Sequence, residues 1–235
     1  MTHQMQRLPA TARPIRPEAQ ASWEQRFAEE RARRIQLERE ILRMKAKLQR
    51  TRIDVVSARQ MALHDELTLL PNRTLFRERV RAALMGASQG VAPVAVLYLD
   101  LNGFKLVNDT YGHAVGDKVL NIIGTRLGRA VRSQDTVARL GGDEFACLLT
   151  GLTGQLELRQ RAGQVIKAVS ARLKIGDHLV HIDGSAGVAV SPADGNNVDE
   201  LLKSADEAMY RAKKMKEGGA RSAVVSLPKT ARPLC

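Results

Sequence analysis

The sequence predicts an α+β fold in which helices pack on a central mixed, mostly antiparallel sheet, preceded by one long N-terminal helix. Three observations support this class. Short apolar runs bounded by glycine have the length and boundaries of strands and hairpins. Amphipathic stretches separate those runs and have the spacing of helices. Residues 21–63 contain neither proline nor glycine and are rich in Arg, Glu, Gln and Leu. Helices interleaved with hairpins are typical of a two-layer α+β sandwich.

Composition limits the classes of protein to consider. The 235 residues suit one domain plus an accessory segment, and the net charge of +12 arises mostly outside residues 64–218. That balance argues against nucleic-acid binding by the globular part. Cys147 and Cys235 have neither disulfide nor metal-site spacing. The sequence lacks a run of about 20 apolar residues and a signal-peptide region, so we expect a cytoplasmic protein with no membrane span.

The first 63 residues divide into two parts. Residues 1–20 contain three prolines among polar and basic residues, and we expect them to be disordered. Residues 21–63 should form a coiled-coil helix that joins two copies in a parallel homodimer. A single solvated helix is the alternative. The heptad seam, interrupted at three positions, consists of Phe27, Leu37, Ile41, Met44, Leu48 and Val55.

Residues 64–149 should contain two helices and three strands. After the Pro71-Asn72 turn, Thr74 should cap a helix that runs to about Leu84. A continuous apolar run predicts a central strand at 94–101, and a later apolar stripe predicts a helix around 119–127. Two further strands, 136–140 and 144–149, should form a hairpin around a glycine turn.

The remaining chain should add two helices, a second hairpin and a short strand. We expect helices over 156–173 and 198–216. The second hairpin should pair 179–182 with 185–190 around Asp183-Gly184. A last strand at 223–226 falls within the C-terminal strand and tail, residues 219–235.

Acidic residues stand at two of the predicted strand ends. Asp100 closes the central strand, and Asp143 and Glu144 follow the glycine pair of the hairpin. Each acid alone is ordinary turn or cap chemistry. Together they suggest a site for Mg²⁺ beside a nucleotide phosphate, because this hard ion takes oxygen ligands from converging elements.

Several motifs occur in one order along the chain. The central one is Gly141-Gly142-Asp143-Glu144-Phe145, and the others lie at 65–73, 100–105, 108–109, 111–117 and 205–213. Over residues 64–218 this series resembles the GGDEF family of diguanylate cyclases, which are similar to nucleotide cyclases and the polymerase palm. The resemblance implies the same sandwich fold and a reaction that joins two GTP molecules into cyclic di-GMP, releasing two pyrophosphates.

The resemblance also implies a metal site and a catalytic pair. Asp100, the backbone carbonyl of Leu101, and Asp143 would hold two Mg²⁺ (or Mn²⁺) ions per active site. Asp143 and Glu144 would be the catalytic residues, with Asp143 proposed as proton acceptor for the 3′-hydroxyl. A metal can itself lower the pKa of that hydroxyl, so the identity of the base stays open.

GTP recognition is carried over in the same way. The resemblance assigns the guanine base to Asn108 and Asp117, and a carboxylate suits the donors on the guanine edge. Without it, Asn108 would be read as a helix cap and Asp117 as an exposed helical acid. The remaining substrate-binding positions are Phe104, Lys105, Gly141, Gly142 and Lys213, of which the lysines alone would be read as solvated.

Arg132 and Asp135 match the family's Arg-x-x-Asp site, at which the product cyclic di-GMP inhibits the enzyme. A salt bridge is the simpler interpretation of such a pair. Two departures concern Asn102, where an acid is frequent, and residues 214–219, which lack the usual Gly-Arg-Asn.

The leading hypothesis is therefore a homodimeric diguanylate cyclase with a possible upstream sensor protein. A non-catalytic nucleotide receptor is the second candidate, although a receptor has no need of paired metal ligands. The third makes the basic coil an arm for DNA or a membrane, which its mixed charges disfavour.

Overall fold

The computed structural model describes residues 17–87, 93–217 and 225–226. The chain divides into two compact units, residues 1–58 and 59–235. Helix α1, Pro17–Leu63, forms the first unit and ends in the second. It begins earlier than predicted, so residues 17–20 are helical rather than disordered. Proline suits a first helical position because its missing N–H would have no partner there. The rest of the predicted disordered segment lies outside the described residues.

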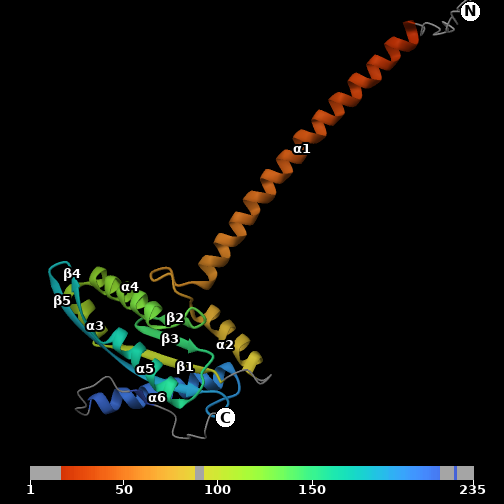
Figure 1. The fold of residues 1–235 in the computed structure, drawn as a ribbon. Coiled ribbons are helices and arrows are strands. Elements are labelled where there is room, and N and C mark those ends of the chain that lie inside the picture. The colour runs from red at the N-terminus through yellow and green to blue at the C-terminus, as the bar shows by residue number, and fades with distance from the viewer. Residues whose placement is uncertain (1–16, 88–92, 218–224, 227–235) are drawn as a thin grey trace, which may run out of the picture. The chain divides into compact units, whose positions relative to one another are not determined.

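The second unit contains a curled sheet with helices on both faces, which confirms the predicted α+β class. The strands are β1 (Ala95–Asn102), β2 (Thr136–Gly141), β3 (Glu144–Leu149), β4 (Ala171–Ile175), β5 (His178–Val190) and β6 (Val225–Ser226). The helices are α2 (Arg73–Ala87), α3 (Phe104–Tyr111), α4 (His113–Ala130), α5 (Gln155–Val169) and α6 (Val198–Glu217). The strand order is β2-β3-β1-β5-β4, with β6 parallel to β5. Figure 1 shows α4 and α6 on opposite sides of the strands.

The central strand was predicted correctly, and β1 pairs antiparallel with both β3 and β5. Its side chains alternate between two cores. Leu97 and Leu99 belong to the cluster that includes α4 and α5 residues, whereas Val96 and Tyr98 pack with residues of α2 and α6. By the same alternation, Asp100 lies on the face covered by α2 and α6.

The prediction of a hairpin around Asp183-Gly184 was wrong. Strand β5 runs through these residues without a break and pairs with β4, whose first residues had been assigned to the preceding helix. The turn lies instead at Gly176, whose φ is 59°. Gly184 serves a packing role, because a Cβ there would lie 2.8 Å from the Val169 side chain at the end of α5.

The residue predicted to cap α2 was also wrong. Asn72, not Thr74, caps this helix, and its Oδ1 accepts hydrogen bonds from the backbone N–H groups of Thr74 (3.0 Å) and Leu75 (3.1 Å). The last helix was predicted closely, and β6 falls within the expected final strand. No helix among the described residues combines the length and apolar character that crossing a membrane requires.

Candidate active site

The glycine turn between β2 and β3 is fixed by an arginine. Gly141 and Gly142 have φ angles of 146° and 54°, which favour glycine. Arg139 donates to the Gly142 carbonyl from Nε (2.9 Å) and Nη2 (2.8 Å). Its Nη1 lies 3.0 Å from both carboxylate oxygens of Asp65. The turn therefore has a defined position relative to the segment that follows α1.

Asp65 is held as a carboxylate in this arrangement. Its Oδ1 also accepts hydrogen bonds from the Thr68 N–H (2.8 Å) and hydroxyl (2.7 Å). Partial burial acts to raise the pKa of Asp65, but the Thr68 hydrogen bonds and the Arg139 guanidinium outweigh it, so the pKa lies below its ordinary value. The charged pair with Arg139 thus persists at neutral pH.

The structure brings the two predicted strand-end acids together. Asp100 pairs in register with Glu144 across β1 and β3, and the Leu101 N–H donates to the Asp143 carbonyl at 3.3 Å. Burial, and then the charge of Asp100, raise the pKa of Asp143, while Lys213 opposes the shift. Lys213 Nζ on α6 lies 2.8 Å from Asp100 Oδ1. Two carboxylates and one ammonium group therefore share a half-buried site.

This site fits a divalent metal that a substrate helps to hold. In the part of the chain that the structure describes, no three acidic, histidine or cysteine side chains form a complete metal cage. Mg²⁺ commonly uses one or two carboxylates and completes its shell with water and substrate phosphates. Asp100 and Asp143 supply such carboxylates, and their mutual repulsion favours a cation between them.

Glu144 is held by two residues whose roles the sequence did not reveal. Its Oε2 accepts hydrogen bonds from Tyr98 Oη (2.9 Å) and Arg73 Nη2 (3.3 Å). Burial, with the Glu144 carboxylate next in importance, raises the pKa of Tyr98 to about 12. The sequence offered one signal for this contact, which is a tyrosine two residues before Asp100 and therefore on the same strand face.

Asn108 and Asp117 lie on adjacent helices, α3 and α4, that approach closely. A Cβ at Gly116 would lie 1.9 Å from Asn108 Oδ1 and 3.2 Å from the ring of Phe104. Glycine therefore lets the α4 backbone lie against Asn108, with Asp117 exposed immediately after it.

The start of α3 presents backbone donors. Gly103 precedes it with a φ of 78° and gives no side-chain cap, so the first N–H groups of the helix, beginning at Phe104, have no capping side chain. The Phe104 side chain is buried in the core, and Lys105 is exposed. Of Phe104, therefore, the backbone N–H and not the side chain is available to a phosphate. Asn102, which stands where the family frequently has an acid, exchanges hydrogen bonds with the Ser185 hydroxyl at 3.0 and 3.2 Å.

Arg132 and Asp135 occupy different environments. The Arg132 side chain is 54% exposed, and its Nη2 lies 2.8 Å from Glu157 Oε1. The Asp135 side chain is 0% exposed and pairs with Arg161. Asp135 also accepts hydrogen bonds from the backbone N–H groups of Arg132 (2.9 Å) and Thr150 (3.1 Å). In this conformation Arg132 is accessible to a ligand, and Asp135 positions the loop that carries it.

Comparisons with known proteins identify the family. A family model described as "Diguanylate cyclase, GGDEF domain" matches residues 62–218. The bifunctional diguanylate cyclase/cyclic di-GMP phosphodiesterase MucR of Pseudomonas aeruginosa is 44% identical over 160 residues, covering 68% of this chain and 23% of MucR. Diguanylate cyclase TpbB of the same species (strain UCBPP-PA14) is 40% identical over 174 residues, covering 74% of this chain and 40% of TpbB.

A solved structure extends the likeness to the long helix. It contains the coiled coil and GGDEF domain of DgcB from Caulobacter crescentus in complex with c-di-GMP, with a TM-score of 0.72 and 27% identity. The match covers 82% of this chain and 99% of that one. The chain therefore spans less than half the length of the two curated relatives but nearly all of this structural neighbour.

Proposed function

The chain belongs to the GGDEF family of diguanylate cyclases, and from this membership we propose that it condenses two GTP molecules into cyclic di-GMP and two pyrophosphates. One observation carries the proposal most directly. Asp100 and Asp143 come from separate strands, yet they lie close enough for the charge of one to raise the pKa of the other. Two carboxylates beside a single ammonium group leave negative charge that a bound cation would neutralise, and metal-assisted phosphoryl transfer uses carboxylates in this way.

The catalytic roles follow the acids at the strand ends. Asp100, Asp143 and the Leu101 carbonyl would hold two Mg²⁺ or Mn²⁺ ions, which when bound would polarise the α-phosphate and lower the pKa of the attacking 3′-hydroxyl. Asp143 accepts the proton of that hydroxyl or directs it to solvent. Glu144, held by its two hydrogen-bond donors, would share this proton transfer or steady the transition state.

GTP recognition uses the surfaces around α3. Asn108 and Asp117 contact the guanine edge, where a carboxylate can accept hydrogen bonds from the donors of guanine. The N-terminal N–H groups of α3, starting at Phe104, face a phosphate together with Lys105. Lys213 adds positive charge beside Asp100, and the bare glycine turn allows close approach of the α-phosphate.

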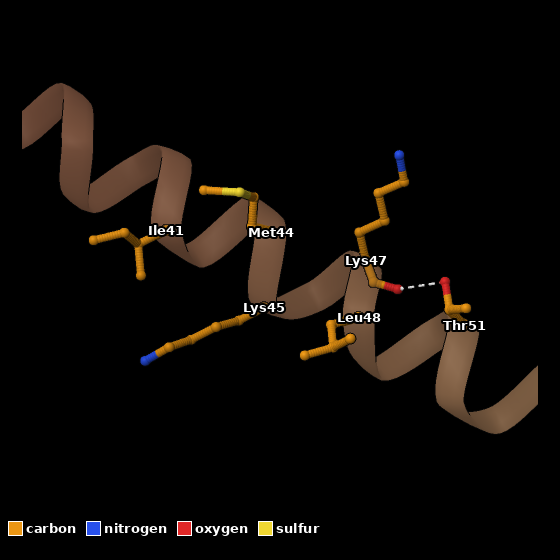
Figure 2. A pocket seen from close by; sticks show the side chains of 6 residues that line it. All are labelled: Ile41, Met44, Lys45, Lys47, Leu48 and Thr51. Carbon is orange, nitrogen blue, oxygen red and sulfur yellow. Dashed lines mark hydrogen bonds between the residues drawn. The ribbon is translucent and has the colours of Figure 1, made fainter.

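Each active site binds one GTP, so two copies must meet to join two molecules. The heptad seam of α1, called the first seam from here on, provides a surface for dimerisation. It comprises Phe27, Leu37, Ile41, Met44, Leu48 and Val55. Its middle forms a shallow apolar hollow lined by Ile41, Met44 and Leu48 with adjoining lysines, as Figure 2 shows. Such a hollow suits a knob from an identical helix.

Charges beside the first seam support a parallel homodimer. In a parallel pair, a residue at heptad position g faces position e of the next heptad on the partner helix. Three such pairs here are attractive and two are repulsive. The attractive pairs are Arg33–Glu38, Glu40–Lys45 and Asp54–Arg59, and the repulsive pairs are Arg26–Arg31 and Lys47–Arg52.

Product inhibition would act at Arg132. A planar guanidinium suits a phosphate or the guanine edge of cyclic di-GMP. Because Arg132 is paired with Glu157, the ligand must displace that carboxylate. Asp135 would contribute mainly by holding the Arg132 backbone. Inhibition by added cyclic di-GMP should therefore weaken in Arg132→Ala and strengthen in Glu157→Gln, and an unchanged inhibition constant in both would contradict this site.

The decisive experiment incubates the purified chain with GTP and Mg²⁺ and identifies the nucleotides by chromatography, with ATP as control substrate. Cyclic di-GMP should form from GTP alone. Asp143→Ala should abolish it, and Asp177→Ala, which removes an exposed carboxylate in the β4–β5 turn, should not. GTP binding without product in the wild type would favour the nucleotide receptor instead.

A further inference from the structure

Helix α1 carries a second apolar seam that the dimer does not use. Seven apolar residues recur with the alternating four- and three-residue spacing of a coiled coil. They are Ala28, Ala32, Ile35, Leu42, Ala46, Ile53 and Val56, interrupted by Arg39 and Gln49. The four larger ones are 45% to 66% exposed: Ile35, Leu42, Ile53 and Val56. The second seam is thus about as regular as the first.

The two seams lie on nearly opposite sides of the helix. At 100° per residue, the centre of the second seam is rotated by roughly 150° from that of the first. A helix in a two-stranded coiled coil needs one apolar seam and normally presents a polar outer face. Pairing through the first seam would therefore leave Leu42, Ile53 and Val56 facing water on the outside of the dimer.

The charges beside the second seam decide what it can accept. Its flanking positions carry five basic and two acidic residues: Arg31, Arg43, Lys45, Arg50 and Arg52 against Glu29 and Glu38. A parallel second copy on this face would gain the attractive pair Glu38–Arg43 but also the repulsive pair Lys45–Arg50, so the flanking charges give self-association through this seam no net support. Acidic flanks on a different helix would be complementary.

We propose that the second seam, residues 28–56 of α1, is a docking surface for a partner helix whose own apolar seam is flanked by Asp or Glu. The partner packs against the outer face of the coiled coil and forms a bundle of three or four helices. Apolar contact with Leu42, Ile53 and Val56 supplies the affinity, and the acidic flanks determine specificity and orientation. This surface is separate from the GTP site, so its occupation does not depend on the proposed reaction.

A synthetic helical peptide tests the proposal with the full chain. The probe carries Leu at its seam positions, Glu at the flanking positions and a fluorescent label, and a matched peptide carries Lys in place of Glu. Anisotropy should show binding of the Glu peptide, at least about tenfold weaker binding of the Lys peptide, and weakening as salt rises. Equal binding of both peptides, or no binding of the Glu peptide, would overturn the proposal.

Paired variants locate the binding surface. Leu42→Glu with Ile53→Glu changes the second seam and should weaken binding of the Glu peptide about a hundredfold or more, while light scattering still shows a dimer. Ile41→Glu with Leu48→Glu changes the first seam and should abolish the dimer while the peptide still binds. Circular dichroism verifies that both remain helical.

Two outcomes would contradict this assignment of the seams. If the second-seam variant became monomeric, that seam would be the dimer interface. If vesicles of phosphatidylglycerol bound through the second seam while the Glu peptide did not, the occupant would be a lipid surface rather than a helix.

Discussion

Substitution of Gly187 by alanine should separate helix α6 from the sheet. Gly187 lies in β5 opposite Tyr98 of β1, on the face that α6 covers. A Cβ at this position would lie 2.1 Å from the Ala205 carbonyl oxygen and from the Met209 backbone nitrogen. Ordinary contact requires 3.4–4 Å, and backbone atoms cannot rotate away as a side chain can. Helix α6 would have to move outward by more than 1 Å.

The expected cost follows from that displacement. Leu201, Ala205 and Ala212 of α6 are fully buried, so a shift of this size weakens many close contacts at once. Overpacking of this kind costs about 1–3 kcal/mol, and we expect the upper end because the obstruction is rigid. Alanine also restricts the unfolded chain, which offsets about 0.4–1 kcal/mol. The net loss should be about 2 kcal/mol or more, or a fall of roughly 4–8 °C in Tm.

Thermal and urea denaturation followed by far-UV circular dichroism measure this loss. Gly128→Ala is the matched control, because nothing lies within 4 Å of its added Cβ. The residue is exposed to solvent and lies within α4, away from both helix ends. That change should stabilise the protein by about 0.5–1 kcal/mol. A Gly187→Ala protein as stable as wild type would refute the inferred backbone contact. An outward movement of α6 would also displace Lys213 from Asp100, so the proposed cyclase activity should fall together with stability.

Arg161→Met should lower the free energy of unfolding by about 3–5 kcal/mol in urea titrations, because it leaves the fully buried Asp135 carboxylate without its cation; a loss under about 1 kcal/mol would contradict the pairing. Tyr98→Phe removes the donor to Glu144 and should cost about 1 kcal/mol. Since the Tyr98 pKa is raised from 10.0 to about 12, wild-type stability falls as pH rises through that range, and the variant should fall less steeply. Asp143→Asn should abolish turnover yet raise Tm near neutral pH. Burial and the neighbouring Asp100 carboxylate raise the pKa of Asp143, so the ionised form of this side chain opposes folding. Wild-type stability should therefore recover as pH falls toward that pKa. A lower Tm for this variant would show that the carboxylate stabilises the fold.

Local chemistry explains why much of the fold could be predicted. The β2–β3 hairpin depends on Gly141 and Gly142, whose positive φ angles are a property of their own backbone. The central strand was visible as a continuous apolar run because both faces of β1 are buried. The resemblance identified Asp100 and Asp143, and the structure places them close together. The metal-binding and catalytic roles of these acids, and the guanine-binding roles of Asn108 and Asp117, remain predictions.

The errors came from residues whose partners are distant in sequence. Asp183-Gly184 has the composition of a turn, but Gly184 is required by the Val169 side chain of α5. Asp183 does not turn the chain either. It accepts hydrogen bonds from Ser170 and Lys216. Partial burial acts to raise the pKa of Asp183, but these hydrogen bonds and the charge of Lys216 together outweigh it, so the pKa lies below its ordinary value. Similarly, no local signal showed that Asp135 would be buried against Arg161.

The Arg139 guanidinium has a mechanical consequence for how such a protein could respond to an input. One planar, rigid group binds Asp65 on one edge and the Gly142 carbonyl on another. Asn72 in turn binds the carbonyls of Ala62 and Leu63 in the last turn of α1. A rotation of that last turn would therefore reach the Gly141-Gly142 turn through a few short polar links, without any strand having to slide. Stiff coupling of this kind transmits small displacements that a flexible hinge would absorb.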